Sequence, residues 1–217
     1  MDELKDKVPF HCIITGPTNC GKTEYLISQL RDAYRNVFEY IVLICPTYAK
    51  NKTYKGFAHG DPRFIVISPD NNPDEINDIL EDVEEVFGSD SSKRSTLVIL
   101  DDCAFTKDLK QRSNKFISLA FSGRHQNISL WVLTQQLTAI AKPFRENVAC
   151  IISFFTPNRV ANQTLFDEYG GDLSLECKKN FKQILKSEKY SRICFCLRHP
   201  YNSYVEIPAS TGTGENS

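Results

Sequence analysis

The residues with the most evident chemistry are Gly16-Pro17-Thr18-Asn19-Cys20-Gly21-Lys22-Thr23. An apolar run from Phe10 precedes them, and a helical pattern begins at Glu24. Two glycines at this spacing followed by Lys-Thr, between a strand and a helix, are typical of a loop that holds nucleotide phosphates. Backbone N–H groups surround the β-phosphate, and the positive end of the following helix faces the same anion. We therefore predict that residues 16–23 bind a nucleotide, with Lys22 on the β- and γ-phosphates and the Thr23 hydroxyl on Mg²⁺.

Asn19 occupies a position at which many such loops carry a further glycine. Asparagine adopts left-handed backbone conformations more readily than most residues. The substitution is therefore compatible with a phosphate-binding loop, provided that the backbone turns there.

Two carboxylates end another apolar run, residues 96–100, which is followed by Asp101 and Asp102. A buried strand that delivers two acids at its end has the pattern of a Walker B motif. Asp101 is predicted to complete the Mg²⁺ shell, and Asp102 to polarise the attacking water. A helix- or loop-capping role is the ordinary alternative for a single aspartate.

A third candidate follows the apolar run 128–133, which ends in Thr134-Gln135-Gln136. Ligands of parallel α/β sheets bind outside the carboxyl ends of the strands. Gln135 is therefore predicted to sense the γ-phosphate or its water, and Gln136 is the adjacent alternative.

Two arginines could stabilise transition-state charge, Arg124 before this strand and Arg145 after it. Supply of such a residue by a neighbouring subunit adds large rate factors. We favour Arg124 for this role in trans, with a surface ion pair as the alternative for either residue.

The apolar runs indicate the elements that position these residues. Continuous β-branched runs such as 40–44 and 96–100 are typical of strands buried on both faces of a parallel sheet. Strands alternate with helical patterns, which predicts an α/β fold with a mostly parallel sheet flanked by helices and two closing strands, 192–197 and 203–207. Residues 1–8 are expected to be a loose lead-in, 47–62 a loop, and about 73–87 an acidic amphipathic helix. One domain is expected over 1–209, with a disordered tail over 210–217.

Bulk composition narrows the function classes. The 41% hydrophobic content supports a packed core, and the net charge of −1 provides no global attraction to nucleic acid or membrane. The eight cysteines form no C-x-x-C pair, several lie in apolar runs, and no apolar run approaches eighteen residues. Reduced thiols inside a cell, with no secretion and no membrane partner, are therefore expected.

Two basic stretches could contact phosphates of DNA. The first, within 175–200, carries Lys178, Lys179, Lys182, Lys186, Lys189, Arg192 and Arg198. The second, within 107–115, carries Lys107, Lys110, Arg112 and Lys115. Ordinary solvated lysine on outer helices is the alternative for both.

The order of GPTNCGKT, LVILDDCA, FSGRHQNISLWVLTQQ and PFREN resembles the FtsK/HerA superfamily. More narrowly, it is similar to the packaging ATPases of poxviruses, related large DNA viruses and virus-like Maverick/Polinton elements. The resemblance covers about residues 10–155, and G-R-H-x-N-x-S before the glutamine-ended strand is its most specific part. It implies a RecA-like (ASCE) P-loop fold and a homo-oligomeric ring of five or six subunits that hydrolyses ATP with Mg²⁺. It further implies double-stranded DNA and a capsid protein as partners, at a viral assembly site in the host cell. By motif position, Lys22 and Thr23, Asp101 and Asp102, Gln135 and Arg124 would carry the roles given above.

Other classes of protein remain to be weighed. A GTPase is disfavoured because Asn51-Lys52-Thr53-Tyr54 lacks the final aspartate of the guanine-reading motif. A small-molecule kinase is disfavoured because no arginine-rich lid follows the central helices. A nucleotide-switched scaffold for capsid assembly, without productive turnover, is the non-enzymatic alternative.

Overall fold

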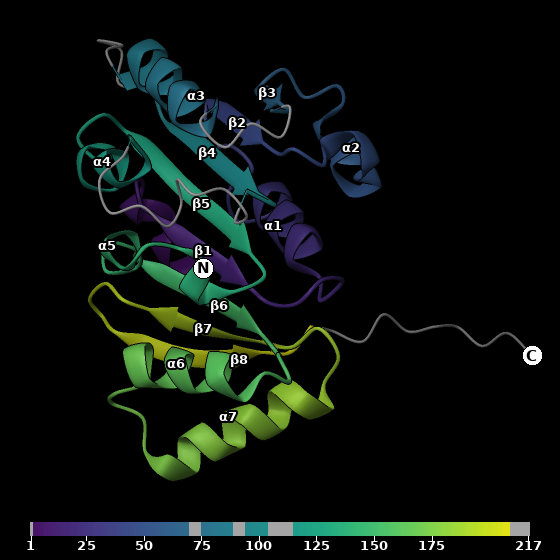
Figure 1. Ribbon diagram of the computed structural model, residues 1–217, viewed down its shortest axis with the longest axis vertical. Helices are drawn as coiled ribbons and strands as arrows, with labels where there is room; N and C mark the ends of the chain where they lie inside the picture. The colour runs from purple at the N-terminus through teal and green to yellow at the C-terminus, as the bar shows by residue number, and fades with distance from the viewer. Residues whose placement is uncertain (1, 70–74, 89–93, 104–114, 209–217) are drawn as a thin grey trace, which may run out of the picture.

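A computed structural model of the chain describes residues 2–69, 75–88, 94–103 and 115–208. The expected tail, 210–217, lies outside these residues, as do Lys107, Lys110 and Arg112. The described residues form one eight-stranded sheet in the order β3-β2-β4-β5-β1-β6-β7-β8 (Figure 1). The strands are β1 (Cys12–Thr15), β2 (Tyr40–Ile44), β3 (Phe64–Ile67), β4 (Thr96–Asp101), β5 (Ile128–Thr134), β6 (Cys150–Phe154), β7 (Arg192–Cys196) and β8 (Asn202–Glu206).

The first six strands are parallel, and β7 and β8 add in antiparallel orientation. This confirms the predicted mostly parallel sheet with antiparallel closing strands. Strand β5 lies between β1, which leads into the phosphate loop, and β4, which ends at the paired acids. One strand therefore separates the strand of the phosphate loop from the strand of the paired acids.

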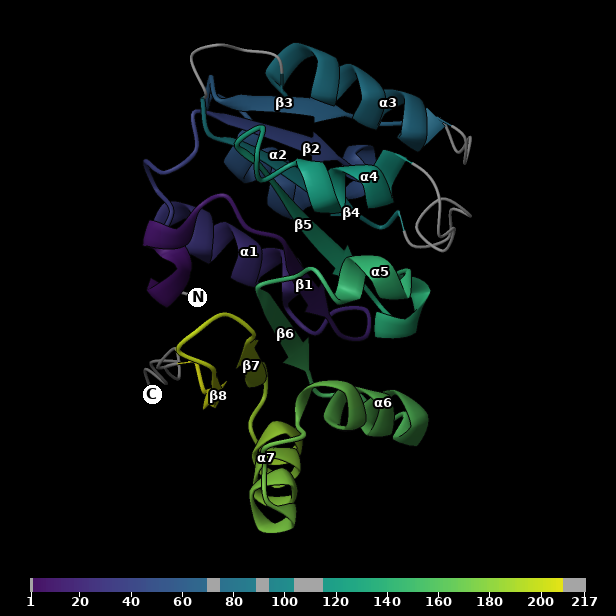
Figure 2. The same cartoon turned by 90° about the vertical axis from the view of Figure 1, so that its left-hand side faces the viewer.

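Helices cover both faces of the sheet (Figures 1 and 2). One face packs against α1 (Lys22–Arg31), α2 (Lys52–Ala58) and the buried Leu4 of the 3-10 helix η1 (Asp2–Lys7). The other face packs against α3 (Glu75–Val83), α4 (Lys115–Ser122), α5 (Lys142–Arg145), α6 (Arg159–Tyr169) and α7 (Leu175–Ser187). Successive side chains of a strand point to opposite faces of the sheet. In β1, Cys12 and Ile14 therefore pack in the core beside α1 and α2, and Ile13 packs in the core on the other face. None of the helices formed by the described residues is long and apolar enough to cross a bilayer.

Two local predictions were wrong. Residues 1–8 are not a loose lead-in, since Leu4 is buried and the ammonium group of Lys7 donates to the carbonyl of His199 at 2.7 Å. Residues 47–62 are not a plain loop, since they contain η2 (Tyr48–Lys50) and α2. The side chain of Asn51 caps α2 by accepting hydrogen bonds from the backbone N–H groups of Thr53 and Tyr54.

The acidic helical segment extends to about the expected end, but its last turn is not α-helical. Helix α3 ends at Val83 and continues as one π-helical turn, η3 (Glu84–Gly88), in which Val86 is exposed. Its apolar residues Ile76, Ile79 and Leu80 are buried, as their helical spacing predicts.

Candidate nucleotide site

The phosphate loop connects β1 to α1, and its backbone is shaped by three residues. Asn19 has φ 60°, the left-handed conformation that its residue type tolerates, and Gly21 has φ 97°. At Gly16 the backbone passes close to other atoms: an added Cβ would lie 2.7 Å from Cys20 Sγ and 2.8 Å from Phe154 Cβ. Only glycine fits there, so the loop is held in a narrow turn around the start of α1.

Lys22 lies at the centre of this loop and is buried. Its Nζ donates to the carbonyl oxygens of Gly16 at 2.8 Å and of Pro17 at 3.0 Å. The ammonium group is therefore inside the curve of the loop, where an incoming phosphate oxygen can replace a carbonyl as its acceptor. The position agrees with the predicted phosphate role.

The paired acids lie at the same edge, because β1, β4 and β5 are parallel and end together. The Asp101 carboxylate is buried and accepts from Thr23 Oγ1 at 3.4 Å and from Tyr54 OH at 2.8 Å. Burial, and secondarily the Asp102 charge, raises the pKa of Asp101 to about 6, although the Tyr54 hydrogen bond opposes this. The structure thus brings the predicted Mg²⁺ ligands Thr23 and Asp101 into direct contact.

Asp102 follows β4 in a left-handed conformation, φ 56°. Its Oδ2 accepts a hydrogen bond from Thr47 Oγ1 at 2.9 Å. This bond orients the carboxylate beside Asp101, and no other described residue donates a hydrogen bond to it, so its other oxygen could accept one from a water molecule.

Gln135 and Gln136 reach the site from the end of β5. Both line a small crevice of about 20 Å³ together with Gly16 and Thr156. The backbone of Gln136 is held by Thr134, whose Oγ1 accepts from Gln136 N at 3.2 Å and donates to Gln136 O at 2.9 Å. Both glutamines therefore lie beside the phosphate loop, as predicted for the sensor position.

Arg124 lies elsewhere, in the turn 123–127 between α4 and β5. Gly123 closes this turn, since an added Cβ would lie 2.6 Å from Leu119 O, and Asn127 takes φ 58°. The turn precedes β5, so it lies at the amino edge of the sheet, about 20 Å from the phosphate loop for a seven-residue strand. Arg124 is exposed and cannot reach the phosphate loop of its own chain.

Arg145 is buried at the end of α5, and its Nη1 pairs with Glu168 Oε2 at 2.6 Å. An internal ion pair therefore accounts for this arginine, which leaves Arg124 as the better candidate for a role in trans.

Sequence reasoning missed three residues at the site. Tyr54 and Thr47 hold the acids but lie in the segment that was expected to be a loop. The third is Tyr190, which is partly exposed in the turn before β7 at φ 64°. Its ring carbon Cδ1 lies 3.3 Å from the position that a Cβ would take on Gly21. Asn51, the N-cap of α2, was the sequence feature that could have predicted this helix. No sequence feature predicts the position of Tyr190, which only the fold brings to the site.

Several of the described basic residues have partners within the chain. Lys115 pairs with Glu84, Arg192 Nε with Glu206 Oε2 at 2.6 Å, and Arg198 Nη1 donates to the Lys7 carbonyl at 3.1 Å. Lys182 and Lys186, in contrast, both line a groove between α6 and α7.

Known proteins resemble this chain in sequence and in fold. A family model described as "Poxvirus A32 protein" matches residues 2–167. The chain belongs to the poxvirus A32 protein family. Its relatives include the DNA packaging protein OPG160 of vaccinia virus (strain Copenhagen) and that of variola virus. Each is 27% identical to this A32-family chain over 151 residues, 68% of the chain and 54% of the relative. The chain thus spans about half the length of these relatives.

The fold of this A32-family chain also matches solved structures. The DNA-packaging ATPase B204 of Sulfolobus turreted icosahedral virus aligns with a TM-score of 0.68 at 15% identity, over 92% of this chain and 97% of B204. B204 of the related virus 2, in complex with ATP-gammaS, aligns with a TM-score of 0.65 at 16% identity over the same shares. At such identities the likeness shows a common P-loop ATPase fold.

Proposed function

We propose that this chain is an ATP-hydrolysing motor that moves double-stranded DNA into a viral capsid as a homo-oligomeric ring. One observation carries the proposal: the Asp101 carboxylate, next to Asp102, accepts hydrogen bonds from Thr23 and Tyr54. These residues lie at the same edge of the sheet as Lys22, whose ammonium group is inside the phosphate loop. This arrangement supports hydrolysis rather than nucleotide storage, because the Asp102 carboxylate, oriented by Thr47, lies where it could accept a proton from water.

The residues present fit ATP and Mg²⁺. The turn at Gly16 has no room for a side chain, and the buried Asp101 carboxylate faces a threonine hydroxyl, an oxygen pair suited to Mg²⁺. Thr23 and Asp101 would hold the ion, and the backbone N–H groups of residues 18–23 with Lys22 would bind the phosphates. The bound ion would neutralise charge that develops on the phosphate oxygens.

The remaining roles follow from position. Asp102, oriented by Thr47, accepts a proton from the attacking water. Gln135 reports on the γ-phosphate from the end of β5, with Gln136 beside it. Arg124 acts on the nucleotide of a neighbouring subunit, because it lies at the opposite edge of its own sheet.

DNA as the substrate is supported by the names of the relatives and of B204, each described as a packaging protein. A capsid protein as docking partner, and action at the site of virus assembly, follow from the same proposal. A GTPase is less well supported, because Asn51 caps α2 instead of presenting a base-reading loop.

The scaffold alternative differs from the motor in turnover. The test is phosphate release by the purified protein with and without linear double-stranded DNA, beside Asp102→Asn, with the mass of the particle measured in solution. A motor gives turnover that rises with DNA, requires Asp102 and accompanies oligomer formation. Tight ATP binding without phosphate release, even with DNA and capsid protein, would support a scaffold instead. Turnover by a monomer that ignores DNA would support a kinase or switch.

A further inference from the structure

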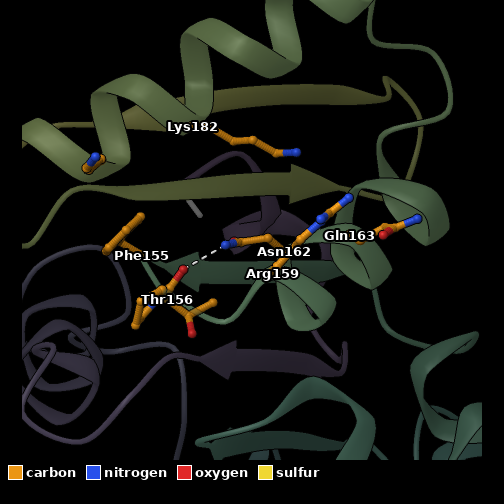
Figure 3. A pocket seen from close by; sticks show the side chains of 8 residues that line it. Phe155, Thr156, Arg159, Asn162, Gln163 and Lys182 are labelled. Atoms are coloured by element: carbon orange, nitrogen blue, oxygen red, sulfur yellow. Dashed lines mark hydrogen bonds between the residues drawn. The ribbon is translucent and has the colours of Figure 1, made fainter.

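A groove runs between α6 and α7, beginning where β6 ends (Figure 3). Its volume is about 640 Å³, and Thr156, Arg159, Asn162, Gln163, Lys182 and Lys186 are among the residues that line it. Figure 3 shows Arg159 and Lys182 extending from the two helices toward the same space. The lining includes three cationic side chains and, among the described residues, no carboxylate.

The lysines of the groove continue as a row along α7. Lys178, Lys182 and Lys186 are spaced four residues apart, so they share one face of the helix over about 12 Å. Lys178 Cε lies 3.4 Å from the position of a Cβ on Gly170, at the end of α6. The Lys182 ammonium lies 4.8 Å from the centre of the Phe166 ring. The row therefore follows α6 toward its first residue, where Arg159 adds a fourth cation.

These charges are not neutralised by ion pairs within the part of the chain that is described. Two carboxylates near these helices are engaged with other residues: Glu168 of α6 pairs with Arg145, and Glu206 of β8 pairs with Arg192. The groove thus has concentrated positive charge and amide donors, the combination that binds phosphate oxygens from outside the chain.

We propose that this groove holds the phosphodiester backbone of one strand of duplex DNA, an inference that rests on the proposed function. The lysine row of about 12 Å is long enough to contact more than one phosphate of a single strand. The side-chain amides of Asn162 and Gln163 supply neutral donors between the cations. Contacts of this kind carry no sequence information, as translocation along any DNA requires.

The groove is also connected to the nucleotide site. Asn162 Nδ2 donates to the carbonyl oxygen of Thr156 at 2.7 Å, and Thr156 lines both the groove and the crevice that contains Gly16 and Gln135. A movement of the phosphate loop or of Gln135 could therefore reach the proposed DNA contacts through Thr156 alone. Thr156 thus provides a short structural connection by which hydrolysis could change the affinity of the groove for DNA.

The test compares two double variants of the full chain. Lys182→Gln/Lys186→Gln removes two groove charges. Lys5→Gln/Lys55→Gln removes two exposed charges, one from η1 and one from α2, which pack on the opposite face of the sheet. Binding of a fluorescein-labelled 30-base-pair duplex is measured by anisotropy from 50 to 300 mM salt. The groove variant should bind at least tenfold more weakly at 100 mM, with a slope of log K against log salt smaller by about 2. The control should match the wild type.

Basal ATP turnover and the KM for ATP serve as the check that both variants are folded, and both should be unchanged. Equal DNA affinity of the two double variants overturns the groove assignment and leaves the motor intact, provided that wild-type turnover still rises with DNA. A raised KM for ATP with unchanged DNA binding assigns the groove to the nucleotide and also overturns it. Wild-type protein that neither binds the duplex nor responds to it overturns both proposals.

Discussion

The two edges of the sheet differ in how their charged groups are balanced. At the carboxyl edge, Lys22, Asp101 and Asp102 each have hydrogen-bond partners within the chain. At the amino edge, Arg124 is exposed. The pKa of Arg198 is lowered chiefly by its own burial and secondly by the charge of Arg124. Burial, and secondly the charge of Arg124, also lowers the pKa of His11 to about 4, so the His11 ring stays neutral at neutral pH. One edge carries the proposed nucleotide site, whereas the other exposes the positive charge of Arg124.

A ring of subunits would bring the two edges together, since the amino edge of one chain could then face the nucleotide of the next. Such an arrangement makes binding a property of the single chain and turnover a property of the assembly. The following predictions test this division.

The largest effect is expected at the amino edge. Arg124→Ala should lower the DNA-stimulated turnover of the assembled protein by about 1,000-fold or more, with ATP affinity unchanged, because the arginine acts on the transition state. The neighbouring exposed His125→Ala serves as the matched control and should retain turnover. Phosphate release and titration with a non-hydrolysable ATP analogue measure the two quantities.

Mixing gives the sharper form of this test. Arg124→Ala and Asp102→Asn are each expected to be inactive alone. When they assemble at random in equal amounts, about a quarter of the interfaces combine an intact Asp102 with an intact Arg124 from the neighbour. Recovery of a comparable share of activity is expected, and its absence would contradict action in trans.

The carboxyl edge should show a conflict between stability and function. The pKa of Asp101 is raised from 3.8 to about 6, chiefly by burial, so its charged form costs about 3 kcal/mol of folding free energy at pH 7.5. The cost is present above the folded pKa and vanishes as the pH falls toward the unfolded value, because the folded chain then takes up the proton. Asp101→Asn should therefore be more stable than wild type by up to about 3 kcal/mol at pH 7.5 and no more stable near pH 4.

Urea unfolding in EDTA, without nucleotide, measures this difference at each pH. The variant should at the same time lose Mg²⁺-dependent hydrolysis. An Asp101→Asn protein that is no more stable than wild type at pH 7.5 would show that the surroundings of Asp101 favour its charge.

The same two edges show what sequence can and cannot predict. The phosphate loop and both acids were predicted because each is a local pattern: a loop of fixed spacing, or polar residues at the end of an apolar run. The left-handed Asn19 was also anticipated from residue type, and its φ of 60° confirms it.

Tyr54 could not be predicted in the same way. Its helix α2 has seven residues with a glycine among them and buries only Tyr54 and Ala58, too weak a pattern to identify. The hydroxyl meets Asp101 across 47 positions of sequence, a contact that only the sheet order creates. The role of Arg124 stays a prediction for a related reason, since a partner in another subunit leaves no periodicity in the chain.

The smallest of these effects is expected at Thr47, which touches Asp102 through a single hydrogen bond of 2.9 Å. Thr47→Val keeps the shape of the side chain and removes the donor, so Asp102 loses its orientation while the phosphate loop is untouched. The kcat for ATP should fall about tenfold, the equivalent of one hydrogen bond to a charged group, with KM within about twofold of wild type. Thr47→Ser keeps the donor and should retain most of the activity.

The effect of Thr47→Val on steady-state ATP turnover, measured in wild-type and in Asp102→Asn protein, decides whether Thr47 acts through Asp102. In the Asp102→Asn background the residual turnover should not respond to Thr47→Val, because the group that Thr47 orients has lost its charge. A further tenfold loss there would show that Thr47 supports the fold of the edge and not the aspartate. The carboxyl edge would then owe its geometry to packing around η2, and Asp102 would stand without a positioning partner.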